Sequence, residues 1–118
     1  MVGVSFDEIR RIALELPSAE EVLTWGIDAT FRVNGKMFVV SAPEASHATV
    51  KASPDEQAAL VAEDPETYSI APYTGRFGWV RVTLSRVEPD EIRELVVAAW
   101  RSTAPKKLVA SYDAGTGS

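Results

Sequence analysis

Four basic side chains and one tryptophan are the residues of this chain best suited to binding chemistry. They are Arg32, Lys51, Arg76, Trp79 and Arg81. Guanidinium and ammonium groups bind phosphate and other anions, and an indole ring can stack on a flat base. All five lie in strand-like or turn-like parts of the chain. They form a site only if the fold brings them to one face of a sheet.

Catalytic and metal-binding chemistry has little support. The chain has no cysteine, which excludes a thiolate nucleophile and a cysteine-ligated metal. Its single histidine, His47, has only Ser46 and Glu44 as polar sequence neighbours, whereas a nucleophilic triad or a metal site needs more partners. Adjacent acids such as Glu20-Glu21 are interpreted as solvated helix ends. We therefore expect no catalytic residue, no metal site, no cofactor and no enzymatic activity.

Two capping boxes locate the first two helices. Ser5 with Glu8, and Ser53 with Glu56, have the spacing at which a serine and a glutamate cap the same helix end. The first helix is expected to end at Pro17, because a residue before proline disfavours helical backbone angles. The other expected elements are strands over 29–33, 36–41, 47–51, 68–73 and 79–84, a loop over 18–28, and a third helix that begins at Pro89.

The order helix, three strands, helix, two strands, helix predicts an α+β fold. Asn34-Gly35 between two strand-like runs predicts a tight type I′ hairpin. Short connections favour an antiparallel sheet. We therefore expect a two-layer sandwich in one domain, with a five-stranded antiparallel sheet and all helices on one of its faces.

Strand alternation predicts which side chains face away from the helices. Across a two-residue hairpin Phe31 should lie opposite Phe38, with Val40 on the same, buried side. The opposite side is the open face, and no carboxylate is expected on it. The side chains predicted to lie there include Arg32, Met37, Val39, His47, Lys51, Trp79 and Arg81.

The charges are unevenly distributed. The formal net charge is −5 and the pI is about 4.8, which opposes non-specific binding to nucleic acid. The strand regions 28–53 and 67–87, however, hold six basic residues against Asp28 and Glu44, so the acids belong mainly to the helices. No apolar run approaches the roughly 20 residues that span a bilayer, and the first residues lack a signal-peptide layout. We expect a cytoplasmic protein without a membrane partner.

The segment Gly75–Gly78 fits a G-x-x-G pattern. In nucleic-acid-binding KH domains such a loop clamps the backbone of the strand. Here it joins two predicted strands, so we interpret it as a turn that needs glycine dihedrals, with Arg76 at its tip.

Several stretches resemble the MmcQ/YjbR-like family. The matching residues are 13–17, Glu20-Glu21, Trp25-Gly26, 31–38, 71–73, 78–82 and the closing 99–109. We expect a single domain of this kind over residues 1–112, and the small and polar residues that close the chain predict a disordered tail over 113–118. The resemblance implies a two-layer fold like that of secretion chaperones. The family is often described as DNA-binding and has no agreed catalytic motif.

Together these observations predict a binding domain that holds DNA or another polyanion on its open sheet face. Two alternatives remain. The face can be an ordinary solvated sheet surface, or an interface for a protein partner or a second copy through Met37, Val39 and Trp79.

Overall fold

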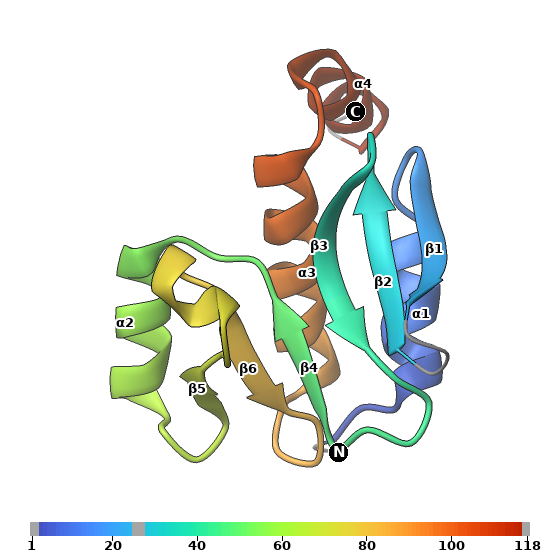
Figure 1. Ribbon diagram of the computed structural model, residues 1–118. Coiled ribbons are helices and arrows are strands. Elements are labelled where there is room, and N and C mark those ends of the chain that lie inside the picture. The colour runs from blue at the N-terminus through green and yellow to red at the C-terminus, as the bar shows by residue number, and fades with distance from the viewer. Residues whose placement is uncertain (1–2, 25–27, 117–118) are drawn as a thin grey trace.

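The sheet has six strands and is antiparallel throughout. The structure is a computed structural model that describes residues 3–24 and 28–116. The strand order is β1-β2-β3-β4-β6-β5 (Figure 1). The strands are β1 (Ala19–Thr24), β2 (Asp28–Val33), β3 (Lys36–Ser41), β4 (His47–Val50), β5 (Tyr68–Ile70) and β6 (Val80–Thr83).

The helices cover one face of this sheet. Helix α1 (Phe6–Leu14) and helix α3 (Pro89–Thr103) lie behind the strands in Figure 1, and the near face of the sheet is uncovered. Helix α2 (Pro54–Glu63) lies at the β5 end, and α4 (Lys106–Thr116) lies beyond the β2–β3 hairpin. A short 3₁₀ helix, η1 (Thr74–Phe77), precedes β6. The predicted α+β class with an antiparallel sheet is therefore correct, but only α1 and α3 cover the face on which all helices were expected.

The local signals read from the sequence form as predicted. The Ser5 hydroxyl accepts from the Glu8 N–H at 3.2 Å, and both capping boxes are complete. Asn34 and Gly35 have φ values of 53° and 77°, as a type I′ turn requires.

The core lies between the sheet and the pair α1 and α3. Ile9 and Ile12 from α1, and Ile92 and Val96 from α3, are buried against the strands. Trp100 is fully buried near the end of α3, and its indole N–H donates to the Pro17 carbonyl at 3.1 Å. That bond ties the C-terminal end of α3 to the chain that leaves α1. Trp25-Gly26 lie outside the described residues.

The predicted loop over 18–28 is wrong, because residues 19–24 form β1 and raise the strand count from five to six. The sequence of this strand lacks the usual alternation of apolar and polar residues. The strand lies at the edge of the sheet, where even its Leu23 side chain is 67% exposed. Glu20-Glu21 are therefore strand residues that point to opposite faces and not helix ends. Glu21 pairs with Arg10 of α1 at 2.6 Å.

A β-bulge shifts the predicted alternation along β3. Phe31 pairs with Val39 and Arg32 with Met37, so Phe38 is the extra residue. Both Phe38 and Val39 are fully buried, and Val40 pairs with Thr30 on the open face. The prediction had placed Val39 outward and Val40 inward. At the other end of the chain, the expected tail over 113–118 is helical as far as Thr116.

Candidate functional site

One row of side chains crosses the open face from edge to edge. Directly paired residues of an antiparallel sheet share a face, so the register defines this row. It contains Val22, Thr30, Val40, Thr49, Arg81 and Ser69, one from each strand in spatial order. Arg32 lies one step along β2 on the same face and is opposite Met37. The register thus brings Arg32 and Arg81 to the same side of the sheet, as predicted.

An apolar hollow of about 410 Å³ lies over the middle of this face. Its walls come from β2, β3, β4 and the segment between β5 and β6, and are lined by Thr30, Met37, Val40, Thr49, Pro72, Tyr73, Thr74 and Trp79. Trp79 is on the open face, as alternation predicted, but it is only 8% exposed. It therefore forms part of the hollow's wall and not a free stacking platform.

Tyr73 stands at the rim of the apolar hollow in a strained backbone conformation. Its φ and ψ are 64° and −55°, and the Thr74 N–H donates to the Pro72 carbonyl at 2.6 Å. This is a γ-turn with positive φ, a rare and strained conformation that costs about 1–3 kcal/mol. The side chain is 96% exposed. Residues held this way cluster at binding sites, and the sequence analysis missed Tyr73 because it treated 68–73 as one strand.

A second, polar hollow of about 430 Å³ adjoins the first and shares Val40 and Thr49 with it. Arg81 and His47 line it, and so does Ser46. His47 Nδ1 lies 2.8 Å from the Ser46 hydroxyl and 3.3 Å from Arg81 Nη2. Because a guanidinium only donates, Nδ1 accepts there and Nε2 carries the proton of a neutral ring. Burial, and then the charge of Arg81, lowers the pKa of His47, which keeps the ring neutral.

The three arginines of the predicted site differ from four other arginines in their partners. Arg32 Nε donates to the Thr30 hydroxyl at 3.0 Å, Arg81 contacts His47, and the Arg76 guanidinium lies 4.8 Å from the Phe77 ring centre. All these partners are neutral. Four other arginines are paired with carboxylates, in the pairs Arg10–Glu21, Arg86–Glu66, Arg93–Glu15 and Arg101–Asp113.

The open face is not free of acids, which corrects the prediction. Glu20 of β1 is opposite Arg32 in the register, and Asp28 and Glu44 line the polar hollow. Glu20 was missed because β1 was interpreted as a loop. Across the described residues no ion pair joins Arg32 or Arg81 to these acids, so the basic groups are interspersed with acids and not neutralised by direct contact.

The remaining predicted residues lie away from the two hollows. Lys51 follows β4, its backbone N–H donates to the Phe38 carbonyl, and it lines neither hollow. Arg76 is exposed on η1 and also lines neither. Gly75 and Gly78 are explained by close packing, since a Cβ on Gly75 would overlap the Cγ2 methyl group of Ile70. Arg32 also lines neither hollow, but its Nε donates to Thr30 in the wall of the apolar hollow. The site therefore centres on Arg81 and Trp79, with Arg32 beside them.

The cleft between α2 and α3 has the opposite charge. It has a volume of about 470 Å³, and its rim carries Glu56, Glu63, Glu91 and Glu94. Tyr68 donates to Glu91 at 2.8 Å, and burial followed by this hydrogen bond raises the pKa of the phenol, so it remains a donor. This side repels anions, which leaves the open face as the surface suited to them.

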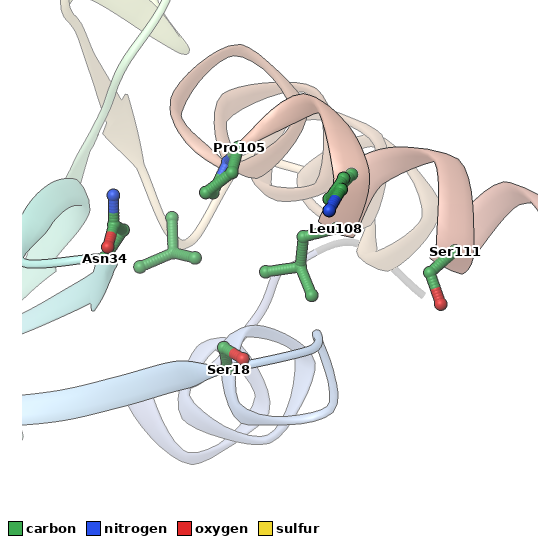
Figure 2. A pocket seen from close by; sticks show the side chains of 7 residues that line it. Ser18, Asn34, Pro105, Leu108 and Ser111 are labelled. Atoms are coloured by element: carbon green, nitrogen blue, oxygen red, sulfur yellow. The ribbon is translucent and has the colours of Figure 1, made fainter.

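A smaller hollow of about 300 Å³ lies where α4 meets the hairpin turn. Figure 2 shows Ser18 and Asn34 on one side of it and Pro105, Leu108 and Ser111 of the α4 segment on the other. Its lining is mostly exposed, so it is a shallow gap left by the docking of α4.

Two further absences hold within residues 3–24 and 28–116. No group of three or more His, Cys, Asp or Glu side chains is placed to hold a metal ion there. In the same described part of the chain, no helix is both long enough and apolar enough to cross a membrane.

The fold and the open face define a small two-layer α+β domain with one uncovered sheet surface. The YjbR family model matches residues 14–102, so the chain belongs to the YjbR family. A crystal structure of Deinococcus radiodurans protein DR2400, with the family-model domain DUF419, has the same fold. Its TM-score is 0.74 at 20% identity, over 81% of this chain and 75% of that one.

Curated relatives are also similar in sequence. The uncharacterized proteins Rv2570 of Mycobacterium tuberculosis (strain ATCC 25618 / H37Rv) and Mb2600 of Mycobacterium bovis are both 36% identical over 59 residues. The match covers 50% of this chain, and the chain spans 46% of the length of each relative.

Proposed function

We propose that this YjbR domain is a non-enzymatic binding module that holds a nucleic-acid strand, or a similar polyanion, on its open sheet face. One observation carries the proposal. Arg32 and Arg81 of this face contact neutral partners, whereas four other arginines are paired with carboxylates. Unpaired guanidinium groups remain available for phosphate, and binding them does not require an existing ion pair to break.

The spacing of the arginines favours a single strand. Arg32 on β2 and Arg81 on β6 are three strands apart in the sheet order, which at roughly 4.8 Å a strand is roughly 14 Å. The apolar hollow lies between them and has room for a flat ring. A strand whose bases are unstacked can place phosphates near the arginines and a base in the hollow. A duplex keeps its bases stacked inside and cannot use the hollow in this way.

Salt dependence tests the proposal. Fluorescence anisotropy is measured with a labelled single-stranded oligonucleotide and its duplex at about 50 mM and about 200 mM salt. If Arg32, Lys51, Arg76 and Arg81 each neutralise one phosphate, the log–log salt slope for the single strand is about −2.8. Affinity then falls about 50-fold over this range. We expect the single strand to bind more tightly than the duplex.

A matched pair of double variants locates the binding face. Arg32→Ser with Arg81→Ser removes two positive charges from the open face and should reduce the magnitude of the salt slope by about 1.4. Arg10→Ser with Arg93→Ser removes the same charge from the helix side and should leave affinity nearly unchanged. Equal losses in the two variants, or no binding at the lower salt concentration, would refute the proposal.

A second candidate function is self-association through the same face. It is supported by Val22 and Met37, which are partly exposed large apolar side chains beside the apolar hollow. Size-exclusion chromatography with light scattering tests it over a range of protein concentration. A dimer that Met37→Glu converts to a monomer supports self-association. A wild-type protein that stays monomeric at the highest concentration excludes it.

A further inference from the structure

The two hollows of the open face adjoin each other and together make a depression with two different ends. They share Val40 and Thr49, so these two side chains form the boundary at which the hollows meet. The first end is lined by the apolar parts of Met37, Pro72 and Trp79. The second end is lined by polar and charged groups, with Arg81 among them. A ligand that fills both ends must therefore have an apolar part directly joined to a charged part.

We propose that this depression is a binding site for a compact ligand in which one flat aromatic ring is joined through a short polar linker to a single anionic group. The proposal rests on the open face of the proposed function and defines what one unit of its ligand must contain. A nucleotide has this chemistry, whether free or within a strand, and so does another aromatic acid.

The apolar end fits a flat ring. Its volume of about 410 Å³ has room for a ring system, and its walls are mostly apolar. Trp79 and Tyr73 can contact the edge or face of a ring, and the Met37 thioether packs favourably against aromatic groups. The strained turn fixes the exposed Tyr73 side chain at the rim, so that it can cover a ring already in place.

The polar end fits one anion and no more. The Arg81 guanidinium donates, and the neutral His47 ring that accepts from it at Nδ1 presents its Nε2–H as a second donor. The lining also includes Asp28 and Glu44, which repel additional negative charge and accept hydrogen bonds from hydroxyl or ammonium groups. These groups select a linker that carries donors and an anionic group of low charge.

Isothermal titration calorimetry with four small probes tests the proposal. The probes are adenosine 5′-monophosphate, adenosine, inorganic phosphate and indole-3-acetate. At least one of the two ring-bearing anions should bind tenfold or more tightly than both adenosine and phosphate. Binding of the mononucleotide alone identifies nucleotides as the source, and binding of both identifies aromatic anions in general. If neither exceeds adenosine and phosphate, the proposal is wrong. Adenosine triphosphate, titrated as a fifth probe, should bind more weakly than the monophosphate, and the reverse order would contradict the role of Asp28 and Glu44.

Variants place the ligand in the depression. Thr49→Phe fills the boundary between the hollows and should abolish probe binding, whereas Val22→Phe adds the same ring on the same face outside them and should not. Arg81→Gln, at an exposed position, should weaken the ring-bearing anion tenfold or more and leave adenosine unchanged, which provides a test should Thr49→Phe fail to fold. Unchanged binding in Arg81→Gln would refute the site. An oligonucleotide that binds with the expected salt slope, while neither ring-bearing anion binds more tightly than adenosine and phosphate, would refute this inference alone and leave the proposed function standing.

Discussion

Replacing Gly78 by alanine should destabilise the domain severely. The φ of Gly78 is 103°, a region that side chains rarely adopt. A Cβ at Gly78 would lie 2.5 Å from the Ser53 carbonyl carbon and 2.6 Å from both Ala52 O and Pro54 N. These are backbone atoms at the start of α2, so they cannot rotate away as a flexible side chain would. The residue that follows is Trp79, a wall of the apolar hollow.

The expected cost of Gly78→Ala has two parts. The left-handed backbone conformation costs a non-glycine residue about 1–2 kcal/mol. Insertion of a methyl group into a closely packed contact costs about 1–3 kcal/mol. The sum, about 2–5 kcal/mol, is a large share of the ~5–15 kcal/mol by which domains are stable. At about 4 °C per kcal/mol for a chain of this length, the melting temperature should fall by about 8–20 °C.

Gly35→Ala is the matched control for this measurement. Gly35 also has a positive φ, 77°, but no heavy atom lies within 4 Å of its virtual Cβ. It therefore carries the backbone part of the cost without the steric part. Thermal unfolding followed by circular dichroism should give a larger loss for Gly78→Ala than for Gly35→Ala, by about 1–3 kcal/mol. Equal losses in the two variants would show that the contact with the start of α2 is not tight, and would refute this reasoning.

Three further predictions concern the core, a helix end and the polar hollow. Trp100→Phe should lower the free energy of unfolding by about 2–4 kcal/mol, because it leaves a cavity and an unpaired Pro17 carbonyl. Urea unfolding should show this loss with an unchanged m value, and a loss below about 1 kcal/mol would contradict the prediction. Ser53→Ala should lower stability by about 1 kcal/mol in the same assay, and no change would mean that the capping box does not matter. His47 should titrate below its ordinary pKa in an NMR titration, and Arg81→Gln should raise that pKa only in part, because burial is the larger cause. Since the pKa of His47 is lower in the folded than in the unfolded protein, its contribution to stability is complete at neutral pH and is lost on acidification. A rise in stability when this ring is protonated would contradict the lowered pKa.

The parts of the fold that depend on local chemistry could be predicted from the sequence. The two serine caps and the Asn34-Gly35 turn each require specific side chains at fixed spacing, and each forms as expected. The same holds for the placement of Arg32 and Arg81 on one face, because alternation along a strand is set by the backbone.

The parts that depend on tertiary contacts could not be predicted. Strand β1 carries two acids and an exposed leucine, and it forms because its backbone pairs with β2. The bulge at Phe38 reverses the facing of Val39 and Val40, and nothing in the local sequence indicates it. For this reason the sequence placed Val40 in the core, although it lies at the boundary of both hollows.

The site was only partly predictable for the same reason. Trp79 was predicted as a stacking residue from alternation alone, but the chain from Pro72 to Thr74 lines the same hollow and leaves Trp79 nearly buried. The exposed aromatic residue at this place is Tyr73, whose orientation follows from a strained turn with no sequence signature beyond the preceding proline.

Chemical-shift mapping of the ¹⁵N-labelled protein tests the central claim most directly, because it reports which residues a ligand contacts. The probe is a short single-stranded oligonucleotide titrated at low salt. The account predicts that the largest amide shifts occur at Thr30, Val40, Thr49 and Arg81, together with the segment 72–74, and that α1 and α3 are nearly unaffected. Shifts concentrated instead on the helices, or at the hairpin and α4, would contradict it.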